Sequence, residues 1–529
     1  MFLETGEVFN TVKTKRLLHL RKDDWPIAAL AILFVLKTFC IAIWVTPLWG
    51  IPDEVGHYAY AEDIALGRGF PELGKATISA EVNTSAQNKT AGASHNWIAQ
   101  HPPIYYVIAA VPIRIAVSIS NDKNLKFISP RLIAVVAGGA ILLILYKTLL
   151  LIGLNRDAST AVAASISLVP QFSTLASGTN HDVPLMFISA LSAYFFVRFV
   201  LLGARVDAYW CAFLLSMAAA TKFTALVMLA PVVSFLIIEY AGSARRKIEF
   251  GAKICALSLL LPGLWFARNV YLFGSPFFDE LDRAKPSDAL EGIGFLEFLR
   301  TYPVVENFFV NFLGWFGGGK TIRAFQLYGW PLEILSLVVL GFFAVLSVEA
   351  CRLLFKQPDN EDIHEESIIV TVSRFFGSVV GSRRDIIVSA VLIATIAFVV
   401  VVSARGDAGT NYVRSFAGIL LMFSAIIAFA IPIFGTPPTV TRLFAYCLVI
   451  VGFFSTVLLI EIFEVSQTLG TMRATNGRYL YPVVPFALIA FGIAAAQWRA
   501  IRICATPAVI LMAYLEMETY LSQVVPFYG

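Results

Sequence analysis

Apolar runs long enough to cross a lipid bilayer recur along almost the whole chain. A membrane helix needs about 20 mostly apolar residues, and the first such run begins near Pro26. Hydrophobic residues make up 58% of the 529 residues and charged residues only 14%, whereas soluble domains carry about 25% charge because they need a polar surface. The sequence therefore predicts an all-α polytopic membrane protein.

On this criterion we count about thirteen transmembrane spans. They lie near 26–48, 131–151, 158–176, 183–200, 208–220, 223–240 and 252–271, and later ones begin near Pro331, Ile386, Arg414, Val440, Tyr479 and Ile503. We expect a cytoplasmic segment at 1–25 and a single transmembrane domain over 26–529. The hydrophilic parts are outer loops at 49–130 and 272–330 and a cytoplasmic insertion at 356–385.

Basic residues set the expected orientation. Short loops rich in Lys and Arg stay in the cytoplasm, and the connections at Arg245 and Arg383 fall on the same side as the basic N-terminus. The two long loops then face outward. The segment 101–118 is apolar but contains Arg114, which would cost at least about 2.5 kcal/mol at the bilayer centre, so we expect a helix along the outer interface. A net charge of only +4 without a basic tract excludes a nucleic-acid partner.

An acidic pair follows the first span directly, in Trp-Gly-Ile-Pro-Asp-Glu-Val-Gly-His-Tyr. Asp53 and Glu54 fall at the start of an expected helix, where the macrodipole favours negative charge. Asp53 shares one helix face with His57, and Glu54 shares the adjacent face with Tyr58. The pattern places two carboxylates beside a histidine and a tyrosine at the membrane surface. A simple charge pair on an interfacial helix is the alternative.

Further polar side chains fall at the outer ends of expected spans. His101 opens His-Pro-Pro-Ile-Tyr-Tyr at headgroup level, and His181 and Asp182 occupy an outer turn. Arginine suits bidentate phosphate contact and lysine acts as a point charge. Any one cation could be a snorkelling anchor, but a lysine between two short apolar segments is a functional candidate. The cations are Arg131, Lys222, Arg268 and Arg478.

Taken in order, these motifs resemble the GT-C superfamily of polyprenyl-phosphate-sugar-dependent glycosyltransferases. The chain is similar to a bacterial branch catalogued as a domain-of-unknown-function family (number 2142), from about 26 to 496. The motifs are Pro-Asp-Glu-Val-Gly-His-Tyr, His-Pro-Pro-Ile-Tyr-Tyr, Ser-Gly-Thr-Asn-His-Asp, Thr-Lys-Phe-Thr, Ala-Arg-Asn-Val-Tyr-Leu-Phe-Gly-Ser-Pro and Gly-Arg-Tyr-Leu-Tyr-Pro.

The resemblance implies residue roles. Asp53 would act as the catalytic carboxylate with Glu54 beside it, and the departing polyprenyl phosphate would meet Arg268 and Arg478 first, then Arg131, Lys222 and His101. Where aminoarabinose-type relatives have a lysine this chain has His101, so phosphate binding there would need a protonated imidazole. The residues expected to contact substrate are His57, Tyr58, Tyr105, His181, Asp182 and Tyr481.

The implied reaction moves a sugar from a polyprenyl-phosphate donor to a glycan, lipid or protein acceptor by an inverting displacement. The implied location is a bacterial plasma membrane, with the site on the outer side. No residue is assigned to a metal and no cofactor is required, although nearby carboxylates could hold Mg²⁺ or Mn²⁺. Two alternatives remain open: a transporter or flippase for a lipid-linked glycan, and an O-antigen polymerase or ligase.

Overall fold

The computed structural model describes residues 21–86, 95–280, 292–302, 304–316, 322–323, 439–471, 476–497, 509, 512–514 and 516–528. The chain divides into two compact units, residues 1–331 with 447–529, and residues 332–446. Of the second unit only the start of one helix, 439–446, is described. The predicted segments 1–20 and 356–385, and the predicted spans near 331, 386 and 414, lie outside the described residues.

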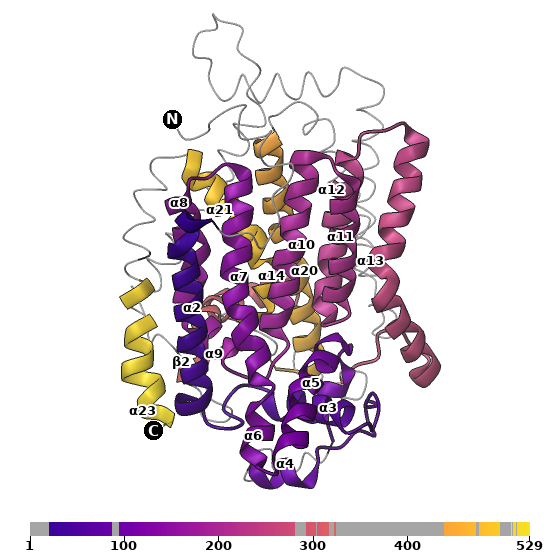
Figure 1. The fold of residues 1–529 in the computed structure, drawn as a ribbon. Coiled ribbons are helices and arrows are strands. Elements are labelled where there is room, and N and C mark those ends of the chain that lie inside the picture. Colours follow the sequence, from indigo (N-terminus) through magenta and orange to yellow (C-terminus); the bar gives the residue numbers. More distant parts are fainter. Residues whose placement is uncertain are drawn as a thin grey trace, which may run out of the picture. The chain divides into compact units, whose positions relative to one another are not determined.

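Six helical segments in the described ranges are long and apolar enough to cross a membrane. They are Lys22–Val45, Lys123–Ile152, Asp182–Leu202, Ala244–Phe273, Thr439–Leu469 and Gly477–Ala496. Each matches a predicted span, so the prediction of an all-α polytopic membrane protein is confirmed for this part of the chain (Figure 1). The total of about thirteen stays a prediction.

The elements of the first half are η1 (Lys22–Asp24), α2 (Trp25–Cys40), η2 (Ile41–Val45), α3 (Glu54–Ala65), α4 (Ala80–Ser85), η3 (Trp97–Gln100), α5 (Ile104–Ile119), α6 (Lys123–Ile128), α7 (Arg131–Ile152), α8 (Arg156–Ser165), η4 (Ile166–Leu168), α9 (Pro170–Ala176), α10 (Asp182–Leu202), α11 (Arg205–Ala219), η5 (Phe223–Ala225), α12 (Leu226–Glu239) and α13 (Ala244–Phe273). The later ones are α14 (Phe295–Thr301), α15 (Val304–Leu313), β1 (Trp315–Phe316), β2 (Ile322–Arg323), α20 (Thr439–Leu469), η8 (Gly477–Val483), α21 (Val484–Gln497), η9 (Thr519–Val524) and α23 (Val525–Tyr528). β1 and β2 form a short antiparallel pair, with Trp315 opposite Arg323.

The predicted span at 158–176 is built from two short helices, α8 and α9, joined by η4. Pro170 causes the break, because a proline inside a helix removes one hydrogen bond and clashes with the preceding turn. It is instead the first residue of α9, a position where its missing N–H costs nothing. The break leaves α9 directed toward the turn that carries Asp182.

The first outer loop folds into a compact group of helices. Figure 1 shows α3, α4, α5 and α6 together at one end of the membrane helices of this unit. Their shared core includes Tyr58, Tyr106 and Phe127. The 16 residues of α5 span about 24 Å at 1.5 Å per residue, too little for a tilted crossing. Its outer face exposes apolar side chains such as Val111 and Ile115, as expected of an interfacial helix.

The membrane helices of the first unit pack side by side, each against the next. α7 lies against α2 and α10, α10 against α11, and α11 against α13. Polar contacts also join the helices: Lys37 of α2 forms a 2.7 Å ion pair with Glu516, and Ser173 of α9 donates to the same carboxylate at 2.6 Å. These contacts hold α9 in place, and with it the turn that follows α9 and leads to Asp182.

Candidate active site

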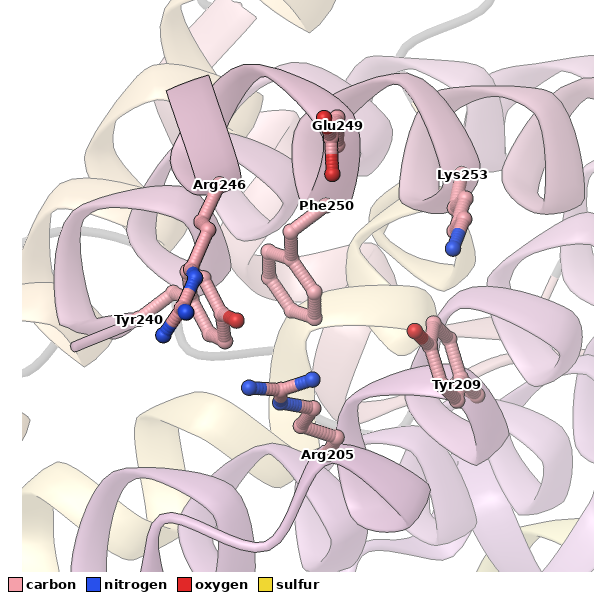
Figure 2. Close-up of a pocket in the computed structure, with 7 residues that line it drawn as sticks. All are labelled: Arg205, Tyr209, Tyr240, Arg246, Glu249, Phe250 and Lys253. Carbon is pink, nitrogen blue, oxygen red and sulfur yellow. The ribbon is translucent and has the colours of Figure 1, made fainter. Parts of the chain in front are cut away.

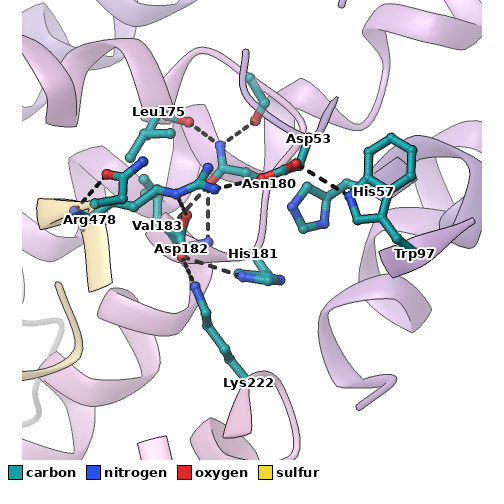
Figure 3. Close-up of polar contacts among 12 residues, drawn as sticks. Asp53, His57, Trp97, Leu175, Asn180, His181, Asp182, Val183, Lys222 and Arg478 are labelled. Carbon is teal, nitrogen blue, oxygen red and sulfur yellow. Dashed lines mark hydrogen bonds and ion pairs between the residues drawn. The ribbon is translucent and has the colours of Figure 1, made fainter. Parts of the chain in front are cut away.

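Two carboxylates and two cations from four separate segments meet at one point (Figure 3). Nη2 of Arg478 lies 2.6 Å from Oδ2 of Asp53. Nζ of Lys222 lies 2.8 Å from Oδ1 of Asp182, and Nε of Arg478 lies 3.7 Å from Oδ2 of the same carboxylate. The predicted residues Asp53, Asp182, Lys222 and Arg478 are thus brought together.

Helix starts position these side chains. Asp53 precedes α3 in a left-handed conformation with φ of 62°, which costs a non-glycine residue about 1–2 kcal/mol but which aspartate tolerates better than most. Asp182 begins α10, and the turn before it is closed by the Asn180 side chain, which accepts from the backbone N–H of Asp182 at 3.0 Å. Both carboxylates therefore sit where the helix macrodipole favours negative charge.

The four charges balance, yet two donors of the Arg478 guanidinium form no hydrogen bond, and one of them, Nε, has only the 3.7 Å ion pair with Asp182. Nε and Nη1 of Arg478 are buried and have no hydrogen-bond partner among the described residues, and the same holds for Oδ2 of Asp182. A buried donor without a partner costs about 1–3 kcal/mol, and more when it is charged. Arg478 and Lys222 also share a ring, since both cations lie over Tyr479, at 5.8 and 4.5 Å from its centroid. The arrangement is suited to binding an anion.

The Asp53 carboxylate is strongly acidic in this setting. Burial by itself raises its pKa, but the positive charge of Arg478 outweighs that effect and lowers the pKa of Asp53 to about 2. The indole N–H of Trp97 donates to Oδ1 at 3.4 Å, and 34% of the Asp53 side chain remains exposed. A carboxylate held in this way is ionised and reachable, but it is a weak base while Arg478 keeps its contact.

Three histidines lie next to the charged cluster. The ring centroid of His181 is 4.5 Å from that of His57 and 4.7 Å from that of His101. The hydroxyl of Tyr106 joins two of them, at 2.9 Å from Nδ1 of His57 and 3.2 Å from Nδ1 of His181. Nε2 of His181 lies 3.4 Å from Oδ1 of Asp182.

This chain of contacts constrains the proton positions. If Nε2 of His181 carries its proton toward Asp182, Nδ1 accepts from the Tyr106 hydroxyl. The Tyr106 oxygen then accepts from Nδ1–H of His57, so Nε2 of His57 carries the lone pair. In this arrangement Nε2 of His57 is a hydrogen-bond acceptor.

Burial keeps these imidazoles neutral. It lowers the pKa of His57 to about 4 and the pKa of His101 to about 3. The prediction that His101 binds phosphate requires a protonated ring, and burial holds the pKa of this imidazole well below its usual range. A role of His101 in phosphate binding stays a prediction.

Glu54 and Arg131 were expected in catalysis and phosphate binding, but they form a buried ion pair with each other. Nε and Nη2 of Arg131 each lie 2.8 Å from an oxygen of Glu54. The three remaining N–H groups of the guanidinium donate to backbone carbonyls at Ala42, Thr46 and Pro47. Every donor of Arg131 is occupied and both side chains are at most 2% exposed, so we correct both assignments to a structural role that fastens α3 to α7 and the end of η2.

Other predicted residues lie apart from the charged cluster. Arg268 donates to the carbonyl of Pro71 at 2.8 Å and stacks over Trp265 at 4.3 Å, without contact to either carboxylate. Tyr58 belongs to the core of the outer-loop helices, with its ring 5.3 Å from that of Phe127, so its expected role in substrate contact is corrected as well.

Tyr105 and Tyr481 line the surroundings of the cluster. Both are buried and their hydroxyls have no hydrogen-bond partner in the described part of the chain. The ring of Tyr105 lies edge-on to that of His57 at 6.3 Å, and that of Tyr481 lies 6.0 Å from Phe172. Polar groups aimed inward in this way are compatible with a substrate contact.

Sequence reasoning missed the residues that connect the charges. The contacts described above are made by Tyr106, Trp97, Asn180 and Tyr479. Three of these residues, all but Trp97, belong to motifs that were singled out because of an adjacent histidine, aspartate or arginine. Their side chains are common at membrane interfaces or in turns, so residue type alone gives no signal. Adjacency to a histidine or arginine in the same motif is the signal that could have found them.

The donor set does not fit a metal ion. In the described ranges no group of three or more His, Cys, Asp or Glu side chains is placed to hold one, and the oxygens of Asp53 and one oxygen of Asp182 already face cations or donors. Magnesium requires several oxygen ligands in near-octahedral geometry.

The family model for dolichyl-phosphate-mannose-protein mannosyltransferases matches residues 100–266. This range contains Asp182 and Lys222, which are half of the charged cluster, together with Tyr106 and two of the three neighbouring histidines, His101 and His181. Over this part of the chain, the match agrees with the expected resemblance to glycosyltransferases that use lipid-phosphate-linked sugars. The more specific branch stays a prediction, and none of the curated proteins matches the chain.

The chain is also similar to several solved structures. For the S. cerevisiae protein O-mannosyltransferase Pmt1–Pmt2 complex bound to the sugar donor, the identity is 17% and the TM-score is 0.37, and the match covers 54% of this chain and 38% of that one. For ArnT from Cupriavidus metallidurans bound to undecaprenyl phosphate, the identity is 13% and the TM-score is 0.35, and the match covers 90% of this chain and 78% of that one. For the apo Archaeoglobus fulgidus oligosaccharyltransferase, the identity is 13% and the TM-score is 0.36, and the match covers 96% of this chain and 56% of that one. The chain thus spans about two fifths of the first of these proteins.

Proposed function

We propose that this protein is a membrane glycosyltransferase that moves a sugar from a polyprenyl-phosphate donor to an acceptor hydroxyl. The observation that carries the proposal is that two buried donors of Arg478, Nε and Nη1, have no hydrogen-bond partner in the described part of the chain, next to the Lys222 ammonium that pairs with the same Asp182. A phosphate would supply the anionic oxygens that these donors lack. The family match over residues 100–266 supports the same reaction class.

Binding of the donor would change the environment of Asp53. Arg478 now lies 2.6 Å from the Asp53 carboxylate and holds its pKa low. When the guanidinium turns part of its charge to a phosphate, that hold weakens and Asp53 becomes a better proton acceptor. Phosphate binding and activation of the base are therefore coupled through one arginine.

The reaction follows as a single displacement. The acceptor oxygen attacks the anomeric carbon while its proton passes to the Asp53 carboxylate, and the bond from that carbon to the phosphate oxygen breaks. The leaving polyprenyl phosphate keeps the electron pair, and Arg478 and Lys222 stabilise its charge. One displacement inverts the anomeric centre. In this proposal His57 and Tyr105 would contact the sugar or the acceptor.

The site is proposed to face the outer side of a bacterial plasma membrane. The basic connections at Arg156, Arg205 and Arg245 lie at the other ends of the same helices, and such connections stay in the cytoplasm. The acceptor would then be a glycan, lipid or protein of the cell envelope.

Cleavage of the donor tests this function without knowledge of the acceptor. Purified protein in nanodiscs would be incubated with a panel of polyprenyl-phosphate sugars and envelope extract, and released polyprenyl phosphate measured. We expect release by the wild type and a loss of at least about a hundredfold in Asp53→Asn. Asp63→Asn is the matched control, because this carboxylate lies on the same helix α3 but pairs with Arg68, and it should retain activity.

The open alternatives give other products. A flippase would move the intact donor across the bilayer without cleavage, and a polymerase or ligase would transfer a preassembled glycan. Full release by Asp53→Asn would contradict the role of Asp53, whereas intact donor in the opposite leaflet would contradict the whole proposal.

A further inference from the structure

A cavity lined by positive charges lies between α11, α12 and α13. Its volume is about 370 Å³, and it is lined by Arg205, Arg246 and Lys253 together with Tyr209, Tyr240 and Phe250 (Figure 2). Figure 2 shows the two guanidinium groups approaching from different helices and the Tyr209 hydroxyl turned toward the same space.

The cavity is at the opposite membrane surface from the candidate active site. Arg205 is the first residue of α11, and Lys222 follows the end of the same 15-residue helix. At 1.5 Å per residue the helix separates them by about 22 Å. The same holds for α13, which carries Arg246 near its start and Arg268 near its end. The cavity thus belongs to the side with the basic connections.

The three cations of the cavity are uncompensated. In the part of the chain that the structure describes, no carboxylate forms an ion pair with Arg205, Arg246 or Lys253. Glu249 also lines the cavity, but it pairs with Arg245 at 3.0 Å. The nearby Asp207 pairs with Arg198 at 3.1 Å. Positive charge therefore dominates the space.

Aromatic rings form a fixed floor beneath these charges. Tyr240 stacks on Phe250 with 4.2 Å between ring centroids, and the Arg205 guanidinium lies 5.0 Å above the Tyr240 ring. An arginine held over a ring keeps its donor face directed outward. The charges are thus presented in a concave site and not only scattered on a surface.

Exposed apolar side chains beside the cavity indicate the form of the ligand. Val206 and Trp210 on α11 are 57% and 50% exposed, and Ile248 on α13 is 73% exposed. Next to a bilayer, such side chains contact acyl chains. We propose that the cavity binds the phosphate headgroup of an anionic membrane lipid in the leaflet opposite to the candidate active site. Basic pockets between membrane helices on the cytoplasmic side bind such headgroups.

Lipid titration of single variants tests the proposal. The unfolding temperature of the purified protein would be followed in phosphatidylcholine nanodiscs with increasing phosphatidylglycerol. We expect the lipid to raise the unfolding temperature of the wild type. Arg246→Gln should raise the amount of lipid needed for half of this shift about fivefold, because one cation near an anionic surface contributes about 1 kcal/mol. Arg205→Gln and Lys253→Gln should have the same effect as Arg246→Gln.

Lys22→Gln is the matched control. Lys22 is exposed and precedes Asp24, which pairs with Lys147 near the end of α7 on the same membrane side, but it does not line the cavity. Equal effects of Lys22→Gln and Arg246→Gln would mean unspecific attraction and overturn the proposal. A further arm adds inorganic phosphate to phosphatidylcholine nanodiscs: an equal stabilisation would identify a soluble phosphate ligand and overturn the lipid assignment. No stabilisation by either would overturn the site itself.

Discussion

At the scale of single residues, chemistry separates carboxylates that are adjacent in sequence. Asp53 faces Arg478 and remains partly exposed, whereas Glu54 is fully buried against Arg131. One step along the start of a helix turns the side chain by about 100°. The sequence motif singled out the acidic pair as a whole, but the pairing of Glu54 with Arg131 of α7 leaves only Asp53 partly exposed.

Glu54→Gln should destabilise the fold strongly. The substitution removes the partner of a guanidinium that is only 1% exposed, and breaking a buried ion pair typically costs about 3–5 kcal/mol. The free energy of unfolding in mixed micelles measures the effect.

The control for Glu54→Gln is Arg68→Gln, which removes ion pairs whose arginine side chain is 46% exposed and should cost at most about 1 kcal/mol. Equal losses in the two variants would contradict a structural role for Glu54.

Folding stability should fall as the pH is lowered from about 6.5. Burial places the pKa of His57 at about 4 and that of His101 at about 3, against 6.5 for an unperturbed imidazole. The unfolded chain therefore binds more protons between these values, so the stabilisation is complete above pH 6.5 and is lost progressively toward the folded pKa. Unfolding temperatures measured between pH 7 and pH 5 should show this slope.

His101→Gln should flatten that slope, because one of the buried imidazoles is gone. His95→Gln is the control, since the His95 side chain is 44% exposed, and the slope should stay as in the wild type. A slope unchanged in His101→Gln would argue against a buried neutral His101.

At the scale of elements, hydrophobic run length predicted the long spans well and missed a break inside a shorter one. The long helices α7, α10 and α13 coincide with predicted spans because each needs about 20 apolar residues to cross. The short pieces α8 and α9 were merged into one span, because their hydropathy hides the proline that divides them. Contacts between helices, such as the ion pair of Lys37 with Glu516, leave no trace in a single sequence.

Close packing of α2 on α7 requires a glycine at 138. A Cβ added there would lie 2.7 Å from Cε1 of Phe34, and Phe34 is itself held by stacking on Phe172 at 5.3 Å. Gly138→Ala should therefore lower the free energy of unfolding by about 1–3 kcal/mol.

Gly263→Ala is the matched control on α13, where a Cβ meets no atom within 4 Å. It should leave stability unchanged or raise it by up to about 1 kcal/mol, because alanine favours a helix over glycine. The packing argument fails if Gly138→Ala is as stable as this control.

At the scale of the molecule, only 14% of the residues are charged, and in the described part of the chain two groups of charges lie at opposite ends of the same helices. One end gathers Asp53, Asp182, Lys222 and Arg478 from segments as far apart as residues 53 and 478. The sequence predicted that these residues share a membrane side, because helix parity and basic loops fix orientation. It could not predict that Arg268 would lie apart from them, because that depends on where each side chain turns within the same surface.

The central claim is that Arg478 and Lys222 receive the phosphate of the donor. The most direct measurement is an electron cryomicroscopy map of the protein in a nanodisc with added undecaprenyl phosphate. We expect the phosphate within hydrogen-bond distance of Nε or Nη1 of Arg478 and of Nζ of Lys222, with the contact between Arg478 and Asp53 lengthened from 2.6 Å. A phosphate bound at Arg268 instead, with the contact between Arg478 and Asp53 unchanged, would contradict the claim.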